Sequence, residues 1–231
     1  MNSVIIPGDP PIEVALRVSA QARRLSLRVS RLDGRVTMTL PKRVPRREAE
    51  AFARDRVDWI RQNLDAMPAP VLLRPDEQVM FAGEMYDLHA TGGRAAKLGD
   101  GVITLPISAP ERTGPRLAAL FKHHARARLT AASDRYATAL GRTHSGITLR
   151  DTRSRWGSCS SEGRLMFSWR LIMAPPEVLE YVAAHEVAHL AEMNHSPAFW
   201  AEVSGLMPDY KARRRWLREK GSILHAFRFR D

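Results

Sequence analysis

An α+β fold is the class that this sequence predicts, on the basis of three features. Short segments that alternate apolar with polar residues fill much of the first half, as in half-buried strands. In the second half, apolar residues recur three and four positions apart, which favours amphipathic helices. The links between the early segments are too short for crossover helices, so we expect small antiparallel sheets there.

Residues 1–110 are expected to form a small antiparallel β-rich region with one helix. Asp33 and Gly34 are typical turn residues and favour a hairpin between two of its strands. The helix is predicted at 46–66, where the apolar residues follow one stripe. The strands are predicted at 12–18, 25–29, 36–40, 78–82, 85–90 and 102–106.

Residues 111–231 are expected to form a second, helical domain with a short sheet, and the proline- and glycine-containing stretch 109–115 marks the boundary. Ser196 followed by Pro197 is typical of a helix N-cap and first turn, and Asp209 is expected to cap a last, basic helix. Helices are predicted at 115–140 and 176–193, and strands at 146–149 and 164–168.

The chain carries a formal net charge of +11, mostly from arginine. The densest basic run consists of Arg213, Arg214, Arg215, Arg218 and Lys220. We interpret this run as the solvated face of a helix. The alternative is an anionic partner, either a nucleic acid or a phosphorylated substrate. No zinc knuckle, RNP-like string or aromatic-interleaved basic motif supports a nucleic acid.

The composition is that of an ordinary globular protein, with 44% hydrophobic and 26% charged residues. No run of about 18 apolar residues is present, so we expect no membrane span. The first residues do not combine a basic segment with an apolar one, so we do not expect export. The single cysteine, Cys159, cannot form an internal disulfide. A cytoplasmic location fits these observations.

The strongest functional motif is the segment His185-Glu186-Val187-Ala188-His189. Side chains four positions apart share one face of a helix, so His185 and His189 can bind the same metal ion. Glu186 lies about 100° further round the helix, where its carboxylate can reach a metal-bound water without binding the metal. Zinc suits imidazole nitrogen and keeps an open coordination position in catalytic sites.

A third histidine, His195, follows His189 by six residues, the interval between the second and third ligands of metzincin sites. We expect it to complete a site for one Zn²⁺ per chain, with Glu202 as the alternative third ligand. Metzincins carry a glycine in the intervening turn where this chain has Glu192, so Asn194 is expected to supply any left-handed residue. A purely structural role for the histidines is less favoured, because burying imidazoles without a purpose is costly.

Two stretches carry a resemblance to a known family: RWGSCSSEGRLMFSWRLIMAPPEVLEYVAAHEVAHLAEMNHSPAFW and LMPDYKARRRWL. They resemble the YgjP-like metallopeptidase family, which is distantly similar to SprT-like and WLM-type zincins. The resemblance is specific over residues 147–217 and looser upstream, where RRLSLRVSRLDGRVTMTLPKRVP resembles the family's N-terminal half. It implies a zincin-like core, a single zinc held by His185, His189 and His195, and Glu186 as the base.

The resemblance also implies that the segment Trp156-Gly157-Ser158-Cys159 forms or flanks an edge strand above the metal, where an extended substrate could pair. The alternative is a tight turn with Trp156 in the core. We interpret Cys159 as a small buried residue rather than a nucleophile, because the best-placed histidines are assigned to the metal. Tyr210 and Arg214 are candidate donors to an oxyanion.

The sequence therefore predicts a zinc metallopeptidase-like hydrolase, in which Glu186 takes a proton from a zinc-bound water that attacks a peptide or protein substrate. A second hypothesis keeps this site and makes it a nucleoside triphosphate pyrophosphohydrolase, although no glycine-rich phosphate loop or magnesium-binding carboxylate cluster supports it. A third hypothesis is a nucleic-acid-associated binding module with a structural zinc, but such zinc sites usually have four protein ligands.

Overall fold

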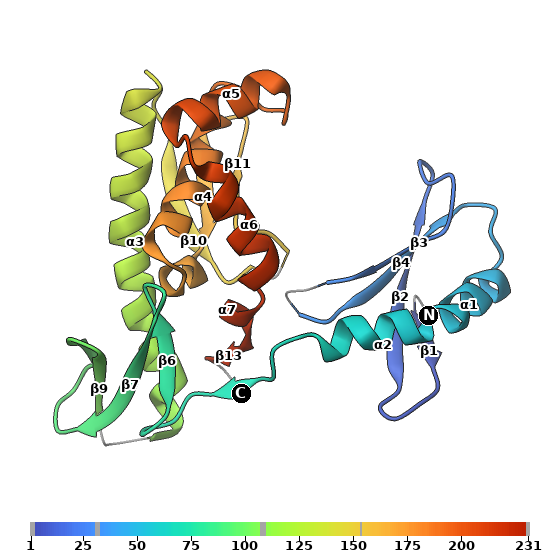
Figure 1. The fold of residues 1–231 in the computed structure, drawn as a ribbon, viewed down its shortest axis with the longest axis horizontal. Helices are drawn as coiled ribbons and strands as arrows, with labels where there is room; N and C mark the ends of the chain where they lie inside the picture. Colours follow the sequence, from blue (N-terminus) through green and yellow to red (C-terminus); the bar gives the residue numbers. More distant parts are fainter. Residues whose placement is uncertain (1–2, 31–32, 107–109, 153, 230–231) are drawn as a thin grey trace. The chain divides into compact units, whose positions relative to one another are not determined.

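Two compact units make up the chain, residues 1–69 and residues 70–231 (Figure 1). The computed structural model describes residues 3–30, 33–106, 110–152 and 154–229. Helices and short sheets occur in both units, so the predicted α+β class is confirmed. Within the described residues, no helix is both long enough and apolar enough to cross a membrane.

The N-terminal unit, blue to cyan in Figure 1, is a mixed sheet of order β1-β2-β4-β3 with helices packed on it. Its elements are β1 (Ser3–Ile6), β2 (Ile12–Ser19), β3 (Ser26–Val29), β4 (Val36–Pro41), α1 (Arg46–Asp55) and α2 (Val57–Asp65). The predicted single helix is interrupted at Arg56, whose φ of −107° and ψ of 12° are not helical. One side of the sheet and both helices share an apolar core that includes Val14, Met38 and Ile60.

The second unit contains a long helix, short sheets and a group of C-terminal helices. Its strands are β5 (Val71–Leu72), β6 (Gln78–Phe81), β7 (Glu84–Thr91), β8 (Lys97–Leu98), β9 (Val102–Pro106), β10 (Gly146–Arg150), β11 (Gly157–Cys159), β12 (Arg164–Ser168) and β13 (Phe227–Arg228). Its helices are η1 (Pro110–Arg112), α3 (Thr113–Ala139), η2 (Trp169–Met173), α4 (Pro176–Ala188), α5 (Pro197–Leu206), α6 (Tyr210–Lys220) and α7 (Ile223–Ala226).

Residues 70–110, expected with the N-terminal region, fall in the second unit. The reason is packing: Phe81 and Leu88 of the β6-β7-β9-β8 sheet are buried in the same core as Leu117 and Phe121 of α3. The stretch 109–115, where the sequence places the domain boundary, begins outside the described residues and continues into η1 and α3.

The sheets are mixed rather than purely antiparallel. The hairpin expected at Asp33 and Gly34 joins β3 to β4 in antiparallel fashion, and Gly34 adopts a φ of 70°. In contrast, β2 pairs with β4 in parallel, and β7 pairs with β9 in parallel. No crossover helix is needed, because the intervening strand, β3 or β8, reverses the chain direction and lies on the far side of the later strand.

The core of the second unit holds α4 at its centre, against α3, α5, α6 and β11. Apolar residues occur on every side of α4, as in a helix enclosed by protein. The C-terminal segment is fixed by the buried Arg170, which donates to the carbonyl oxygens of Leu224 and Phe227 at 2.8 and 3.0 Å and to Asp151 at 2.6 Å. Around this core, α4 contacts both α6 and β11.

Candidate metal centre

The local sequence around α4 explains how two of the histidines are placed. Pro176 occupies the first helical turn, as predicted, where its missing N–H costs no hydrogen bond. The helix ends at Ala188, earlier than the predicted 193, with His189 as its C-cap. His185 and His189 therefore lie one helical turn apart at the C-terminal end of α4.

The chain then turns back to bring His195 to the same place. The backbone N–H groups of Leu190 and Ala191 donate to the carbonyl oxygens of Val187 and Ala188, at 2.8 and 3.1 Å. Within the part of the chain that the structure describes, positive φ outside glycine occurs at Asp76 and Ala82. The expectation that Asn194 adopts a left-handed conformation is therefore wrong, because successive right-handed turns reverse the chain.

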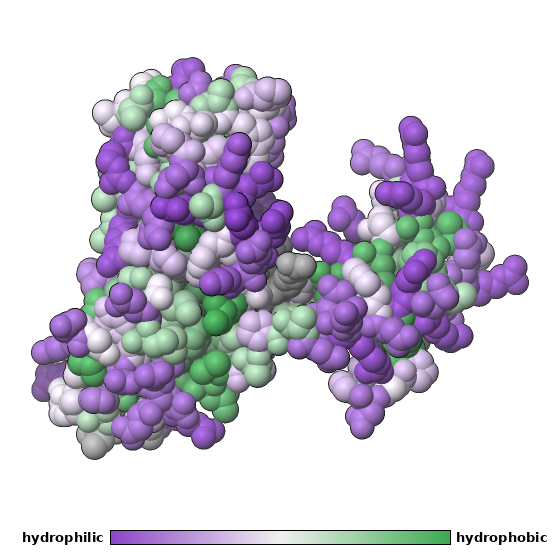
Figure 2. Space-filling model, viewed as in Figure 1, coloured by the Kyte–Doolittle hydropathy of each residue, from purple (hydrophilic) through white to green (hydrophobic). Residues whose placement is uncertain are grey.

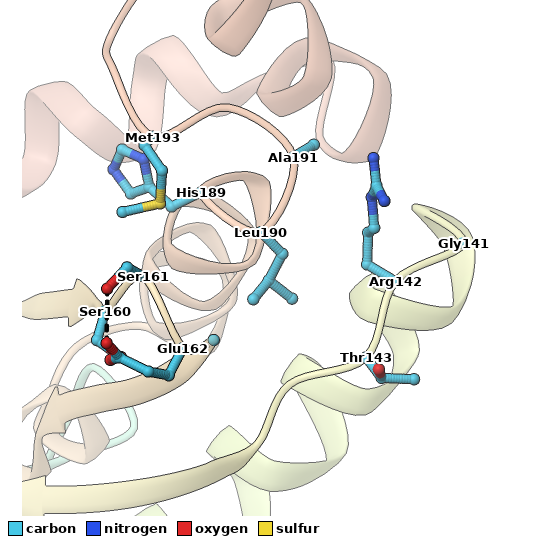
Figure 3. Close-up of a pocket in the computed structure, with 11 residues that line it drawn as sticks. Gly141, Arg142, Thr143, Ser160, Ser161, Glu162, His189, Leu190, Ala191 and Met193 are labelled. Carbon is cyan, nitrogen blue, oxygen red and sulfur yellow. Dashed lines mark hydrogen bonds between the residues drawn. The ribbon is translucent and has the colours of Figure 1, made fainter.

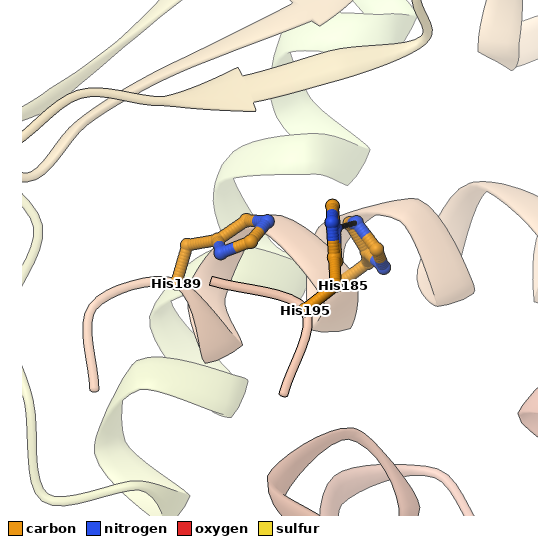
Figure 4. Close-up of side chains that lie close together, drawn as sticks. All are labelled: His185, His189 and His195. Carbon is orange, nitrogen blue, oxygen red and sulfur yellow. Dashed lines mark hydrogen bonds between the residues drawn. The ribbon is translucent and has the colours of Figure 1, made fainter. Parts of the chain in front are cut away.

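The three histidines form a cluster whose ligand atoms all lie within 4.8 Å of one another (Figure 4). The Nε2 atoms of His185 and His195 are 3.1 Å apart, and their rings face each other in Figure 4. His189 Nδ1 donates to the carbonyl oxygen of Glu192 at 2.9 Å, which leaves its Nε2 lone pair available. Among the described residues this cluster contains no carboxylate, so Glu202 is not part of it.

Burial favours the neutral, metal-binding form of His185 and His189. Burial first, then the neighbouring His189, His195 and Arg214, lowers the pKa of His185 to about 3. Burial also lowers the pKa of His189, partly opposed by its hydrogen bond to Glu192. A neutral imidazole with a free lone pair needs no proton removed before it binds a metal ion.

Glu186 is the buried carboxylate beside the histidines, with 6% of its surface exposed. Burial raises the pKa of its carboxyl to about 8, and the positive charge of Arg155 opposes this rise. Its side chain lies against β11, since a Cβ atom added at Gly157 would come within 2.6 Å of both Cγ and Oε1 of Glu186. Only glycine leaves space for this carboxylate at that position of the strand.

A cleft of about 340 Å³ lies on the Glu186 side of the histidines, and we call it the basic cleft. It lies between α4, α6 and the beginning of β11. Its lining residues are Arg155, Trp156, Gly157, Tyr181, Val182, His185, Glu186, Arg214, Leu217 and Arg218. The basic run expected to be a solvated helix face is thus divided: Arg214 and Arg218 line this cleft, whereas Arg213 pairs with Asp209 at 2.7 Å.

A second cavity of about 520 Å³, which we call the serine cavity, opens beside His189 (Figure 3). Ser160, Ser161 and Glu162, which follow β11, line it together with His189 and Met193. The remaining lining residues are Gly141, Arg142, Thr143, Gly163, Leu190 and Ala191. The two cavities therefore flank the histidine cluster, one at each end of β11.

The motif around Trp156 forms the expected edge strand, and of the alternative only the packing of Trp156 on the core is found. Gly157–Cys159 is β11, the edge of the β10-β12-β11 sheet, while Trp156 packs on the core with its ring 5.0 Å from that of His225. Cys159 is partly buried, and burial, with a smaller contribution from Glu186, raises its pKa to about 11. Its thiol is therefore protonated near neutral pH, in agreement with the interpretation that it is not a nucleophile.

Of the two candidate oxyanion donors, Arg214 lines the basic cleft but Tyr210 does not. Tyr210 is buried and stacks on Trp200 at 5.4 Å, and it does not line the basic cleft. Tyr181 lines the cleft instead, with its ring 5.9 Å from that of His185. Tyr181 precedes His185 by four residues on α4, and this spacing could have identified it from the sequence. Arg155 carries no such signal, because it reaches the cleft only through the sheet that holds β11.

A match to a known protein family covers most of the chain. Residues 23–220 match the sequence model of a family described as YgjP-like, metallopeptidase domain. Among solved structures, the chain is similar to the metallopeptidase zymogen abylysin of Pyrococcus abyssi, at 21% identity and a TM-score of 0.37. That alignment covers 40% of this chain and 95% of the other chain. No curated protein matches this chain.

Proposed function

Because the chain belongs to the YgjP-like metallopeptidase family, we propose that it is a zinc peptidase in which His185, His189 and His195 hold the metal and Glu186 is the general base. Membership of the family makes the protein a metal-dependent hydrolase with peptides as its class of substrate. The observation that carries the more specific proposal is the convergence of three imidazoles beside one buried carboxylate.

The donor set fits a zinc ion. Two nitrogens bound at about 2.1 Å in a tetrahedral arrangement lie about 3.4 Å apart, close to the 3.1 Å between Nε2 of His185 and Nε2 of His195. Two neutral imidazole nitrogens in contact can share only one proton, whereas a metal ion satisfies both lone pairs. The carbonyl of Glu192 fixes the tautomer of His189, as outer partners of metal-binding histidines do.

The three histidine ligands also suit a catalytic zinc better than a structural zinc. Three protein ligands leave a fourth position for water or substrate, while structural sites usually fill all four with protein groups. A zinc ion held there would act as a Lewis acid toward a water molecule and a substrate carbonyl. Glu186 would accept the proton of the attacking water and pass it to the leaving amine. A carboxyl with a pKa near neutrality can do both.

The edge strand β11 offers a place for an extended substrate. Among the described residues, β11 pairs with β12 on one side. The hydrogen-bonding groups on its other side can accept a peptide by strand addition. Such a peptide would run from the basic cleft, which Gly157 lines, to the serine cavity, which Ser160 lines, and would cross the histidine cluster between them.

The substitution Glu186→Gln tests the proposed role of the base, because it keeps the shape of the side chain and removes its basicity. We expect the zinc content to stay at about one ion per chain while peptide turnover falls by on the order of 10²–10⁴. The control is Glu177→Gln, the same change on the exposed first turn of α4, which should alter neither quantity. Full turnover in the Glu186→Gln protein would rule out this mechanism.

A further inference from the structure

The basic cleft has a strong excess of positive charge next to the proposed base. Arg155 enters it from the segment before β11, and Arg214 and Arg218 enter it from α6. Glu186 is the only carboxylate among the described residues that line it. Because Glu186 is only 6% exposed, the exposed charged side chains of the cleft are its arginines.

Two of these arginines, Arg155 and Arg214, form no ion pair with the described residues. Among the described residues, no carboxylate lies within ion-pair distance of Arg155 or Arg214, whereas the adjacent Arg213 pairs with Asp209 at 2.7 Å. Arg214 is nevertheless held in place, because its guanidinium lies 4.6 Å from the centre of the Trp200 ring. Burial raises the pKa of Tyr181 in the cleft, and the positive charge of Arg214 opposes this rise.

We propose that the basic cleft is a specificity subsite that binds an acidic side chain of the substrate, next to the bond that is cleaved. This proposal rests on the peptidase function proposed above. Arginine forms paired hydrogen bonds with carboxylates, and Trp156, Val182 and Leu217 supply apolar walls beside the arginines. A volume of about 340 Å³ accommodates a glutamate side chain and its backbone.

The proposal explains why one part of α6 faces the active site. Arg214 and Arg218 are four residues apart and so share one side of the helix, while Arg213 and Arg215 point elsewhere. Arg218 also lies 3.6 Å from Glu219, so its charge is partly balanced. The selectivity should therefore depend mostly on Arg155 and Arg214.

Pairs of peptides that differ only by Glu or Gln near the cleaved bond provide the test. Cleavage of a mixed peptide library first locates the bond, and kcat/KM is then measured for each pair. We expect the wild-type protein to prefer Glu by about tenfold or more, the effect of one charged hydrogen bond. The preference should weaken between about 0.05 M and about 0.5 M salt, because the arginines are accessible to counterions.

The variant Arg214→Gln should lower the Glu-to-Gln ratio toward one. The matched control is Arg215→Gln, which removes the same charge from the adjacent, exposed position outside the cleft and should retain the ratio. A ratio near one in the wild-type protein, or an unchanged ratio in Arg214→Gln, would overturn the proposal.

A binding measurement separates this proposal from the peptidase function. The Glu186→Gln protein is titrated with the same peptides by calorimetry, which needs no cleavage. If the wild-type protein cleaves no peptide but Glu186→Gln binds the Glu peptide more tightly in an Arg214-dependent manner, the cleft is confirmed and the peptidase proposal fails. Equal binding of the Glu and Gln peptides overturns the proposal that the cleft binds an acidic side chain, whatever the rate of peptide cleavage.

Phosphate is the other anion that arginines bind, so inorganic pyrophosphate and a nucleoside triphosphate are tested alongside the peptides. If these anions bind through Arg214 while the Glu peptide does not, the carboxylate assignment is wrong. Hydrolysis of the nucleotide that depends on both Glu186 and Arg214 would favour the pyrophosphohydrolase hypothesis instead.

Discussion

The interiors of the two units differ in what they bury. The described core of the N-terminal unit is entirely apolar, with Met38 and Val14 at its centre. The second unit also buries polar and charged groups, which are Thr113, Ser133, Ser168, Arg170, Glu186, His189 and His225. Figure 2 shows that hydrophilic side chains project from the surface of the N-terminal unit, so its polar residues remain in contact with water.

Two of the buried polar groups of the second unit, Arg170 and Glu186, differ in their hydrogen bonds. Arg170 donates to Asp151 and to two backbone carbonyls. Glu186 accepts no hydrogen bond from the described residues, and burial raises its pKa. A buried group that donates to several partners supports the fold, whereas a buried carboxylate without such partners costs stability and is available for chemistry.

Removing a member of the histidine cluster should have the largest effect. We expect His185→Ala, His189→Ala and His195→Ala each to lose most of the roughly one zinc per chain and the hydrolytic activity, because a two-ligand site is weak. Elemental analysis of the purified variants measures this loss. The control His144→Ala removes an imidazole that pairs with Asp134 at 2.8 Å outside the cluster, and it should keep its zinc. Full zinc occupancy in His195→Ala would instead implicate Glu202.

A smaller effect is expected from Gly157→Ala, which would crowd the buried carboxylate of Glu186 without touching the histidines. The new methyl group would meet Glu186 at 2.6 Å and displace it, so turnover should fall by on the order of tenfold or more while zinc content is retained. The matched control is Gly205→Ala in α5, where a Cβ atom meets nothing within 4 Å. Equal turnover in both alanine variants would show that Gly157 does not position Glu186.

The smallest effect on turnover is expected in the apolar interior of the N-terminal unit. Met38→Ala should lower the free energy of unfolding by about 2–5 kcal/mol through lost burial and a cavity, and leave the zinc content unchanged. Urea unfolding of the zinc-loaded protein measures this change. The volume-conserving Met38→Leu should cost less than about 1.5 kcal/mol. A loss of zinc in Met38→Ala would show that this core does more than stabilise its own unit.

The sequence alone determined the elements and residues whose signals are local. The spacing of His185, His189 and Glu186 on one helix, the Ser196 N-cap that accepts from Phe199 N–H at 3.2 Å, and the β3-β4 hairpin each depend on neighbouring residues. Helical and strand periodicity act over the same short range, which is why the element types were predicted well. Asp209 was only partly predicted: it stands at the N-cap of α6, but its side chain makes no capping bond and pairs with Arg213.

Tertiary structure alone decided the features that join distant segments. The parallel pairing of β2 with β4, the packing of residues 70–110 on α3, and the approach of Gly157 to Glu186 all depend on contacts across long stretches of chain. The same holds for Arg155 and Arg214, which are 59 positions apart in the sequence and line one cleft. Local sequence preferences give no information on contacts between distant segments, because those contacts form when whole apolar faces are buried.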